Sequence, residues 1–189
     1  MPEPLEVAVR RMRRRERAVH PPRVSREGYI ECYLGKKVHV LNVYERCGHA
    51  CAYCFVEWSW SPKTVVAREN LVERVVRDLR RFYRGRRVVI NMGSATDPYQ
   101  PAEKRFGFMR RLIPLLKSCG ASFYICTKSD LILRDLDLLA GYPNVWVGFT
   151  VTSLSQDFSR VFEPNAPNPA RRIDAIQKLL EEGIRVVVR

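Results

Sequence analysis

The sequence predicts an α/β fold built on a parallel β-sheet, and three observations lead to that class. Short β-branched runs alternate with amphipathic helical patterns at intervals of about 35 residues. Because consecutive parallel strands need a crossover connection, this rhythm favours a sheet covered by helices. The runs "VVI" and "VVV" are apolar without alternation, as in strands buried on both faces. We expect an open doubly wound sheet or part of a barrel, and both bind ligands at the carboxyl ends of their strands.

The first half of the chain contains two strand and helix pairs. Residues 37–44, "KVHVLNVY", form the first predicted strand, and residues 87–92, "RVVINM", form the second. A helix is expected between them, within residues 67–85. Its apolar face consists of Leu71, Val72, Val75, Val76, Leu79, Phe82 and Tyr83. Residues 103–120 predict the next helix, kinked at Pro114 and ended by a glycine.

The second half continues the same alternation. Residues 122–126 and 144–151 predict strands, and residues 130–142 between them predict a helix. The last helix begins at Asn168, a good cap residue followed by proline, and ends at a glycine before the strand of residues 184–188. Its apolar face is predicted to consist of Ile173, Ile176, Leu179 and Leu180.

A basic segment precedes the first predicted strand. Residues 10–17, "RRMRRRER", lie outside any periodic apolar pattern and are predicted to form a mobile or surface arm. Pro21 and Pro22 then break the chain. We therefore expect a basic N-terminal arm of residues 1–28 and a βα domain of residues 29–189.

The composition indicates one globular core with a strong positive charge. The chain has 189 residues, of which 46% are hydrophobic. No apolar run reaches about 18 residues and no signal peptide pattern begins the chain, so a cytoplasmic location is expected. The net charge of +13 favours contact with nucleic acid through the basic surface. Both signs of charge also alternate along the helices, which is typical of thermophile proteins, and the two interpretations stay open.

Three cysteines lie close together in "YERCGHACAYCF", directly after the first predicted strand. Cys47, Cys51 and Cys54 are separated by small residues and can surround one compact centre that prefers soft ligands. In a reducing compartment such a group indicates a metal site more than disulfides. One candidate is an iron-sulfur cluster, in which three thiolates would leave one of four irons open. The other is structural zinc, with a fourth ligand from one of three side chains: His49, Cys32 or His39.

At these residues the sequence resembles the radical S-adenosylmethionine (SAM) enzymes, whose signature is three cysteines at this spacing with an aromatic residue before the third. The resemblance implies a 4Fe-4S cluster on Cys47, Cys51 and Cys54 whose open iron binds SAM. One electron, from a reductase or ferredoxin-type donor, would cleave SAM to a 5′-deoxyadenosyl radical that abstracts hydrogen from a substrate. The implied fold is a partial (βα) TIM-type barrel.

Four more segments resemble the spore photoproduct lyase-like branch of this superfamily. They are "GSATDPYQPAEKR", "CTKSDLILRDLDLL", "FTVTS" and "FEPNAPNPARRIDAI", and the likeness extends over residues 38–189. On that pattern Ser94 and Thr152 would contact the amino-acid or ribose part of SAM. Lys128 would pair with its carboxylate, and Tyr53 would stack near its adenine. A lysine and two hydroxyls at successive strand ends also suit one polar pocket.

Three polar residues of these segments receive no ligand role from the sequence. Asp97 stands before a proline and is interpreted as a turn residue. Glu163 and Arg172 belong to the "EPNAP" segment and the helix after it, and no function is assigned to them.

The sequence departs from the lyase pattern at two points. Spore photoproduct lyases carry a thiol hydrogen donor just ahead of the position of Ser94, where this chain has no cysteine in residues 91–93. DNA photoproduct repair is therefore kept as an alternative. The chain stops at Arg189 after the fifth predicted strand, so the expected barrel lacks its sixth unit. We expect either that the sixth unit was separated from this chain or that a partner covers the open edge. A non-catalytic iron-sulfur, zinc or nucleic-acid-binding module is the other alternative.

Overall fold

A five-stranded parallel sheet forms the centre of the molecule. The computed structural model describes residues 7–10, 39–54, 56, 65–68, 70–82 and 88–189. The sheet has the order β2-β5-β6-β7-β8, and every neighbouring pair is parallel. Its strands are β2 (His39–Leu41), β5 (Val89–Met92), β6 (Ser122–Thr127), β7 (Val145–Phe149) and β8 (Arg185–Val188). The predicted α/β class with a parallel sheet is confirmed.

A smaller, three-stranded sheet is formed by strands from the first part of the chain. Its strands are β1 (Val7–Arg10), β3 (Tyr44–Glu45) and β4 (Val65–Arg68), in the order β1-β4-β3. β4 pairs parallel with β1 and antiparallel with β3. Residues 11–38, which include most of the predicted basic arm and Cys32, lie outside the described residues.

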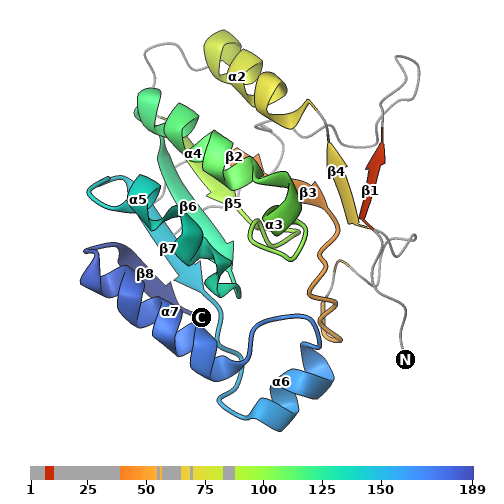
Figure 1. Cartoon of the computed structure of the whole chain (residues 1–189). Coiled ribbons are helices and arrows are strands. Elements are labelled where there is room, and N and C mark those ends of the chain that lie inside the picture. The colour runs from red at the N-terminus through yellow and green to blue at the C-terminus, as the bar shows by residue number, and fades with distance from the viewer. Residues whose placement is uncertain (1–6, 11–38, 55, 57–64, 69, 83–87) are drawn as a thin grey trace.

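The helices connect successive strands of the large sheet. They are α2 (Leu71–Phe82), α3 (Glu103–Phe106), α4 (Phe108–Ser118), the 3-10 helix η1 (Asp130–Asp135), α5 (Leu136–Leu139), α6 (Gln156–Phe162) and α7 (Pro169–Glu181). Figure 1 shows α4, α5 and α7 along one side of the sheet, as in a partial barrel. No helix in the described part of the chain has the length and apolarity needed to cross a bilayer.

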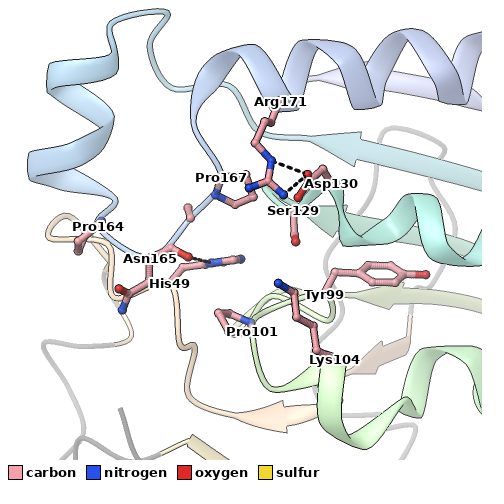
Figure 2. A pocket seen from close by; sticks show the side chains of 11 residues that line it. His49, Tyr99, Pro101, Lys104, Ser129, Asp130, Pro164, Asn165, Pro167 and Arg171 are labelled. Carbon is pink, nitrogen blue, oxygen red and sulfur yellow. Dashed lines mark hydrogen bonds and ion pairs between the residues drawn. The ribbon is translucent and has the colours of Figure 1, made fainter. Parts of the chain in front are cut away.

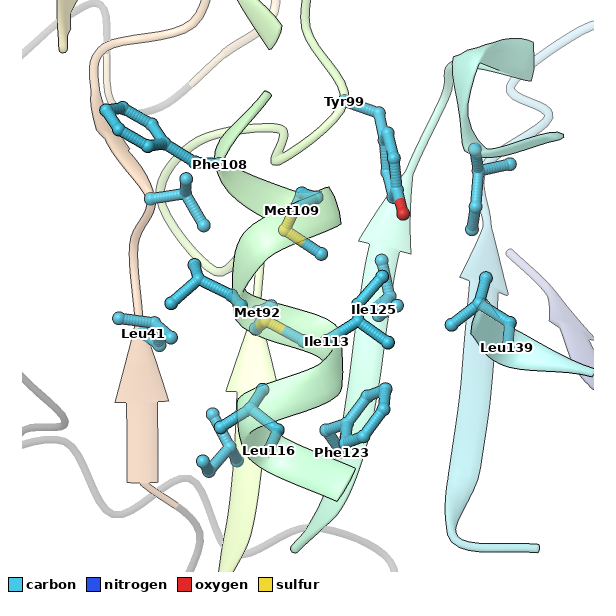
Figure 3. Packing of buried hydrophobic residues seen from close by; sticks show 14 of the residues in the cluster. Leu41, Met92, Tyr99, Phe108, Met109, Ile113, Leu116, Phe123, Ile125 and Leu139 are labelled. Carbon is cyan, nitrogen blue, oxygen red and sulfur yellow. The ribbon is translucent and has the colours of Figure 1, made fainter. Parts of the chain in front are cut away.

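The main core lies between α4 and the sheet. Met109, Ile113 and Leu116 of α4 face Met92 and Phe123 of β5 and β6 (Figure 3), and all five side chains are buried. Full burial of such a side chain contributes about 1.5–3 kcal/mol. This packing fixes β5 and β6, so the loops after those two strands start from rigid positions.

The predicted strand of residues 37–44 is shorter than expected and is divided. β2 covers His39–Leu41 alone, residues 37 and 38 lie outside the described part, and Tyr44 starts β3 in the other sheet. The division falls at Asn42, whose Oδ1 accepts hydrogen bonds from the hydroxyl of Ser94 at 3.3 Å and the amide of Ala95 at 3.1 Å. These bonds hold Asn42 at the carboxyl end of β5, and the chain leaves the parallel sheet there.

The helix predicted for residues 103–120 is divided at a residue that the prediction did not name. The helix divides at Gly107, which has φ of 59°, and not at Pro114, which lies inside α4. The carboxylate of Glu103 accepts hydrogen bonds from the amides of Phe108 and Met109 at 3.1 and 2.9 Å. Because these amides are free at the start of a helix, Glu103 stabilises a second helix start and makes the break favourable.

Other helical predictions also change at their boundaries. The helix expected within residues 67–85 begins at Leu71, because residues 65–68 form β4. The helix expected at residues 130–142 is divided into η1 and α5, and α6 was not predicted. The amide of Leu131 donates to the Ser129 hydroxyl at 3.2 Å, and this short-range cap tightens the first turn.

α7 begins as predicted, but its buried face is rotated by one position. The Asn168 side chain accepts a hydrogen bond from the amide of Arg171 at 2.9 Å, so the predicted cap is confirmed. Ile173 and Leu180 are 36% and 54% exposed, whereas Arg172 is fully buried. The face turns because Arg172 pairs with Glu163 inside the protein.

We predict that Gly93→Ala strongly destabilises the fold. Gly93 has φ of +96°, and an added Cβ would lie 2.5 Å from the carbonyl oxygen of Cys126 and 2.9 Å from Pro98. Left-handed strain and overpacking together should lower the free energy of unfolding by about 2–5 kcal/mol, measured by denaturant titration. Gly141→Ala is the matched control, since Gly141 has φ of +69° and nothing within 4 Å of the added atom. Equal losses in both variants would contradict the close approach.

Candidate functional site

The three cysteines lie on the cysteine loop, residues 46–54, which follows β3. Its backbone is left-handed at Arg46 and Ala50, with φ of 63° and 51°. For residues with a Cβ this conformation costs about 1–2 kcal/mol each. Such a shape persists where surrounding contacts hold it.

The segment after β5 holds one side of the cysteine loop. The amide of Gly48 donates to Oε1 of Gln100 at 2.6 Å, and Nε2 of Gln100 donates to the carbonyl of Arg46 at 2.9 Å. The hydroxyl of Thr96 donates to the same carbonyl at 2.6 Å. The side chain of Gln100 is fully buried, so these contacts are shielded from water.

The segment that joins α6 to α7 holds the other side. The amide of Ala52 donates to the carbonyl of Phe162 at 2.8 Å. Nδ2 of Asn165 donates to the carbonyl of Gly48 at 3.0 Å, and the amide of Asn165 donates to the carbonyl of His49 at 3.3 Å. The cysteine loop is therefore fixed between two segments that are distant in sequence.

The cysteine thiols form a donor set suited to an iron-sulfur cluster. Cys47, Cys51 and Cys54 are free and partly buried. Burial, with the nearby charge of Asp97, raises the pKa of the Cys47 thiol to about 12, and burial also raises the pKa of Cys51. A bound metal supplies the positive charge that makes such thiols into thiolates. Three soft donors on one short loop fit iron-sulfur chemistry.

A structural zinc ion would need a fourth ligand beside the three cysteines. No group of three His, Cys, Asp or Glu side chains in the described ranges is arranged to hold a metal ion. Both ring nitrogens of His49 are engaged elsewhere, so His49 does not serve as a fourth ligand in this arrangement. The fit to a cluster rests on the chemical nature of the three donors.

Asp97 lies behind the cysteine loop and accepts four hydrogen bonds. Oδ1 accepts from the amide of Tyr99 at 2.8 Å and the hydroxyl of Thr127 at 2.7 Å. Oδ2 accepts from the amide of Lys128 at 2.8 Å and Nε2 of His49 at 3.1 Å. Burial would raise the pKa of Asp97, but His49 and the other donors outweigh it and hold that pKa below its usual value.

His49 connects Asp97 to the α6–α7 segment. Its Nδ1 lies 3.2 Å from the carbonyl oxygen of Asn165, and its Nε2 faces the carboxylate of Asp97. Both partners are acceptors, so both ring nitrogens can donate only when the imidazole carries two protons.

The structure brings three predicted SAM-binding residues together. The hydroxyl of Tyr53 lies 3.0 Å from Oγ1 of Thr152, and the ammonium of Lys128 lies 5.6 Å from the centre of the Tyr53 ring. Tyr53 also donates to Glu163, and Thr152 donates to the same carboxylate at 2.9 Å. Tyr53 remains 42% exposed, so part of its side chain is accessible to a ligand. Ser94 is directed toward Asn42 instead, on the neighbouring strand end.

Arg172 holds Glu163, the carboxylate that Tyr53 and Thr152 share. Its guanidinium pairs with Glu163 at 2.5 Å and donates to the carbonyl of Pro167 at 2.7 Å. Burial would raise the pKa of Glu163, but the bonds from Arg172, Tyr53 and Thr152 hold it below its usual value.

Sequence reasoning missed what these polar residues do. The turn assigned to Asp97 is present, since the amide of Tyr99 bonds its side chain, but three of its four contacts come from other segments. Glu163 and Arg172 carried no local signal except their place in the matched segments. Gln100 was not singled out at all. A charged residue placed in an otherwise apolar helix face, as Arg172 is, was the available clue.

A small pocket opens beside this network. Figure 2 shows His49, Tyr99 and Lys104 around it, together with Ser129 and the ion pair of Arg171 with Asp130. Its volume is about 200 Å³. The pocket lies where the cysteine loop meets the segments after β5 and β6. Asp97 forms hydrogen bonds with these same segments.

Comparison with known proteins places most of this chain in one family. The family model described as the radical SAM superfamily matches residues 41–189. An uncharacterized protein of Methanocaldococcus jannaschii is 34% identical over 158 residues, covering 78% of this chain and 57% of that protein. An uncharacterized protein of Mycobacterium tuberculosis is 31% identical, covering 77% of this chain and 46% of its own length.

Solved structures resemble the fold at low sequence identity. A spore photoproduct lyase variant superimposes with a TM-score of 0.68 at 14% identity, covering 97% of this chain and 50% of that one. Another variant, with bound AdoMet and dinucleoside spore photoproduct, has a TM-score of 0.65 at 15% identity, covering 88% and 49%. These TM-scores support the predicted fold. The chain spans about half the length of these lyase chains.

We predict that Arg172→Met destabilises the protein more than the loss of an exposed ion pair. The change leaves Glu163 buried without its partner, which should cost about 3–5 kcal/mol in the free energy of unfolding. Arg160→Met is the control, because its pair with Asp157 is exposed and should cost less than about 1 kcal/mol. Adding Glu163→Gln to Arg172→Met should recover part of the loss. No recovery in a denaturant titration would contradict the buried-charge explanation.

Proposed function

Because the chain belongs to the radical SAM superfamily, we propose that it uses a 4Fe-4S cluster on Cys47, Cys51 and Cys54 to cleave SAM reductively. When bound, the cluster would supply an electron and an open iron, yielding a 5′-deoxyadenosyl radical that takes hydrogen from a substrate. The observation that carries this proposal is the cysteine loop: three partly buried thiols fixed between two distant segments.

The residues beside the loop suit the binding of SAM. Lys128 supplies a cation near the Tyr53 ring and would pair with the carboxylate of SAM. Thr152 and Ser94 offer hydroxyls at two other strand ends. Tyr53, with its hydroxyl tied to Glu163 and Thr152, can present its ring face to adenine. These side chains would orient SAM and keep water from the reacting carbon.

The partners of this reaction are also part of the proposal. A reductase or ferredoxin-type protein would deliver the electron that the reductive cleavage of SAM requires. A further polypeptide would cover β8, an edge strand on which Val187 and Val188 are 42% and 59% exposed.

The net charge favours nucleic acid as a second candidate for the substrate. A charge of +13 attracts polyanions, and the fold is similar to that of spore photoproduct lyase. Residues 91–93, however, are Asn91, Met92 and Gly93, with no thiol at that place. If the substrate is a nucleic acid, its hydrogen donor would therefore differ from that of the lyase. The remaining alternative, a non-catalytic binding module, would show no SAM cleavage.

We predict that anaerobic reconstitution loads about four iron and four sulfide per chain. Changing Cys47, Cys51 or Cys54 singly to Ala should abolish most of that iron, measured by elemental analysis and visible absorption. Cys119→Ala is the control, because Cys119 is exposed and distant in sequence from the loop. One zinc and no iron in the wild-type protein would contradict the proposal.

We also predict that dithionite and SAM yield 5′-deoxyadenosine on the reconstituted protein. Lys128→Met should weaken SAM binding about 10- to 100-fold, as expected for loss of a charge-assisted contact of about 1.5–3 kcal/mol. Lys178→Met removes a charge on the exposed side of α7 and should leave the SAM dissociation constant unchanged. A loaded cluster without any 5′-deoxyadenosine would reject the enzymatic proposal for this chain.

A further inference from the structure

Asp97 occupies a junction between three segments. It lies in the loop after β5, is 9% exposed, and contacts the cysteine loop on one side and the end of β6 on the other. His49, which donates to it, stands between Cys47 and Cys51 in the chain. Lys128, whose amide donates to it, carries the ammonium that faces the Tyr53 ring. One carboxylate oxygen, Oδ2, receives both of these donors.

A turn residue alone would not need this arrangement. The turn at Pro98 uses a single contact, from the amide of Tyr99 to Oδ1. Burying a carboxylate costs several kcal/mol, and the cost is offset here because four donors satisfy both oxygens. Three of those donors come from outside the turn, so they fix the relative positions of the segments that provide them.

We propose that Asp97 is a positioning residue that holds the cysteine loop and the Lys128 strand end in one fixed geometry. The proposal rests on the proposed function, because its consequence concerns the cluster thiols and the cation assigned to the carboxylate of SAM. The backbone of Asp97 forms a hydrogen bond with the Cys47 thiol, and its carboxylate is given no contact with SAM. It acts through His49 and through the backbone of Lys128.

The geometry makes the two contacts interdependent. Nε2 of His49 and the amide of Lys128 lie 3.1 and 2.8 Å from the same oxygen, so displacing that oxygen disturbs both. An asparagine would offer one acceptor oxygen and turn an NH₂ group toward donors at the other. Loss of Asp97 should therefore loosen the cysteine loop and Lys128 together, while each thiol keeps its place in the sequence.

The first test needs no cluster and uses Asp97→Asn in the cluster-free protein. Amide hydrogen exchange at Lys128 and across residues 48–52 should become at least 10-fold faster than in the wild type. Asp135→Asn is the matched control, because Asp135 is also a buried carboxylate with several donors, and its partners Arg134, Arg110 and the hydroxyl of Tyr99 do not belong to the cysteine loop. Exchange that is unchanged, or that rises equally in both variants, would overturn the proposal.

The second test uses the reconstituted proteins. The dissociation constant for SAM, followed by the paramagnetic resonance spectrum of the reduced cluster, should rise at least 10-fold in Asp97→Asn and less than 2-fold in Asp135→Asn. The spectrum without SAM should also change in the first variant alone. Wild-type affinity and spectrum in Asp97→Asn would overturn the inference, whereas absence of a cluster in the wild type would count against the proposed function instead.

A third variant provides the test if Asp97→Asn does not fold. Thr127→Val keeps the side-chain shape and removes one donor to Asp97, at 2.7 Å, along with the contact of that hydroxyl to the amide of Ser129. Faster exchange at Lys128 and across residues 48–52 is expected, by a smaller factor of about 3-fold. Wild-type exchange at both places would contradict the positioning role.

Discussion

The cysteine loop depends on hydrogen bonds that it cannot make within itself. Buried backbone amides and carbonyls must find partners, and a loop without regular structure has few of its own. Gln100 satisfies Gly48 and Arg46 from one side, and Phe162 and Asn165 satisfy Ala52, Gly48 and His49 from the other. The left-handed residues Arg46 and Ala50 persist because of these contacts. The whole arrangement at the strand ends is organised around this loop.

Two buried carboxylates, Asp97 and Glu163, contact residues of the cysteine loop. Asp97 faces His49, and Glu163 faces Arg172, each with further donors on the same carboxylate. The pair of Glu163 with Arg172 is costly to break because one charge would be left without a partner in a dry interior. The ammonium of Lys128 lies over the ring of Tyr53. The site therefore combines soft thiols, a partly exposed aromatic side chain and a positive charge, which suits an iron-sulfur cluster and a zwitterionic cofactor.

The fold of this chain agrees with the family that its sequence matches. Residues 41–189 match the radical SAM superfamily, and the parallel sheet with helices along one side is similar to that of spore photoproduct lyase. The site residues all come from this matched part. The chain departs from the lyase pattern at Asn91, Met92 and Gly93, where it has no thiol. At Gly93 the chain after β5 passes close to the carbonyl oxygen of Cys126. A side chain at that position would collide with the backbone of the next strand.

The sequence by itself determined the parallel α/β class, the cap at Asn168, the three thiols and the placement of Lys128 and Thr152 at strand ends. These features follow from local periodicity, turn chemistry and spacing, which are written into neighbouring residues. The tertiary structure alone decided that residues 103–120 divide at Gly107, that Arg172 is buried, and that Asp97 joins His49 to Lys128. Each of these depends on the partner of a polar group many residues away. No local pattern encodes such a partner, because it exists only once the strands are side by side.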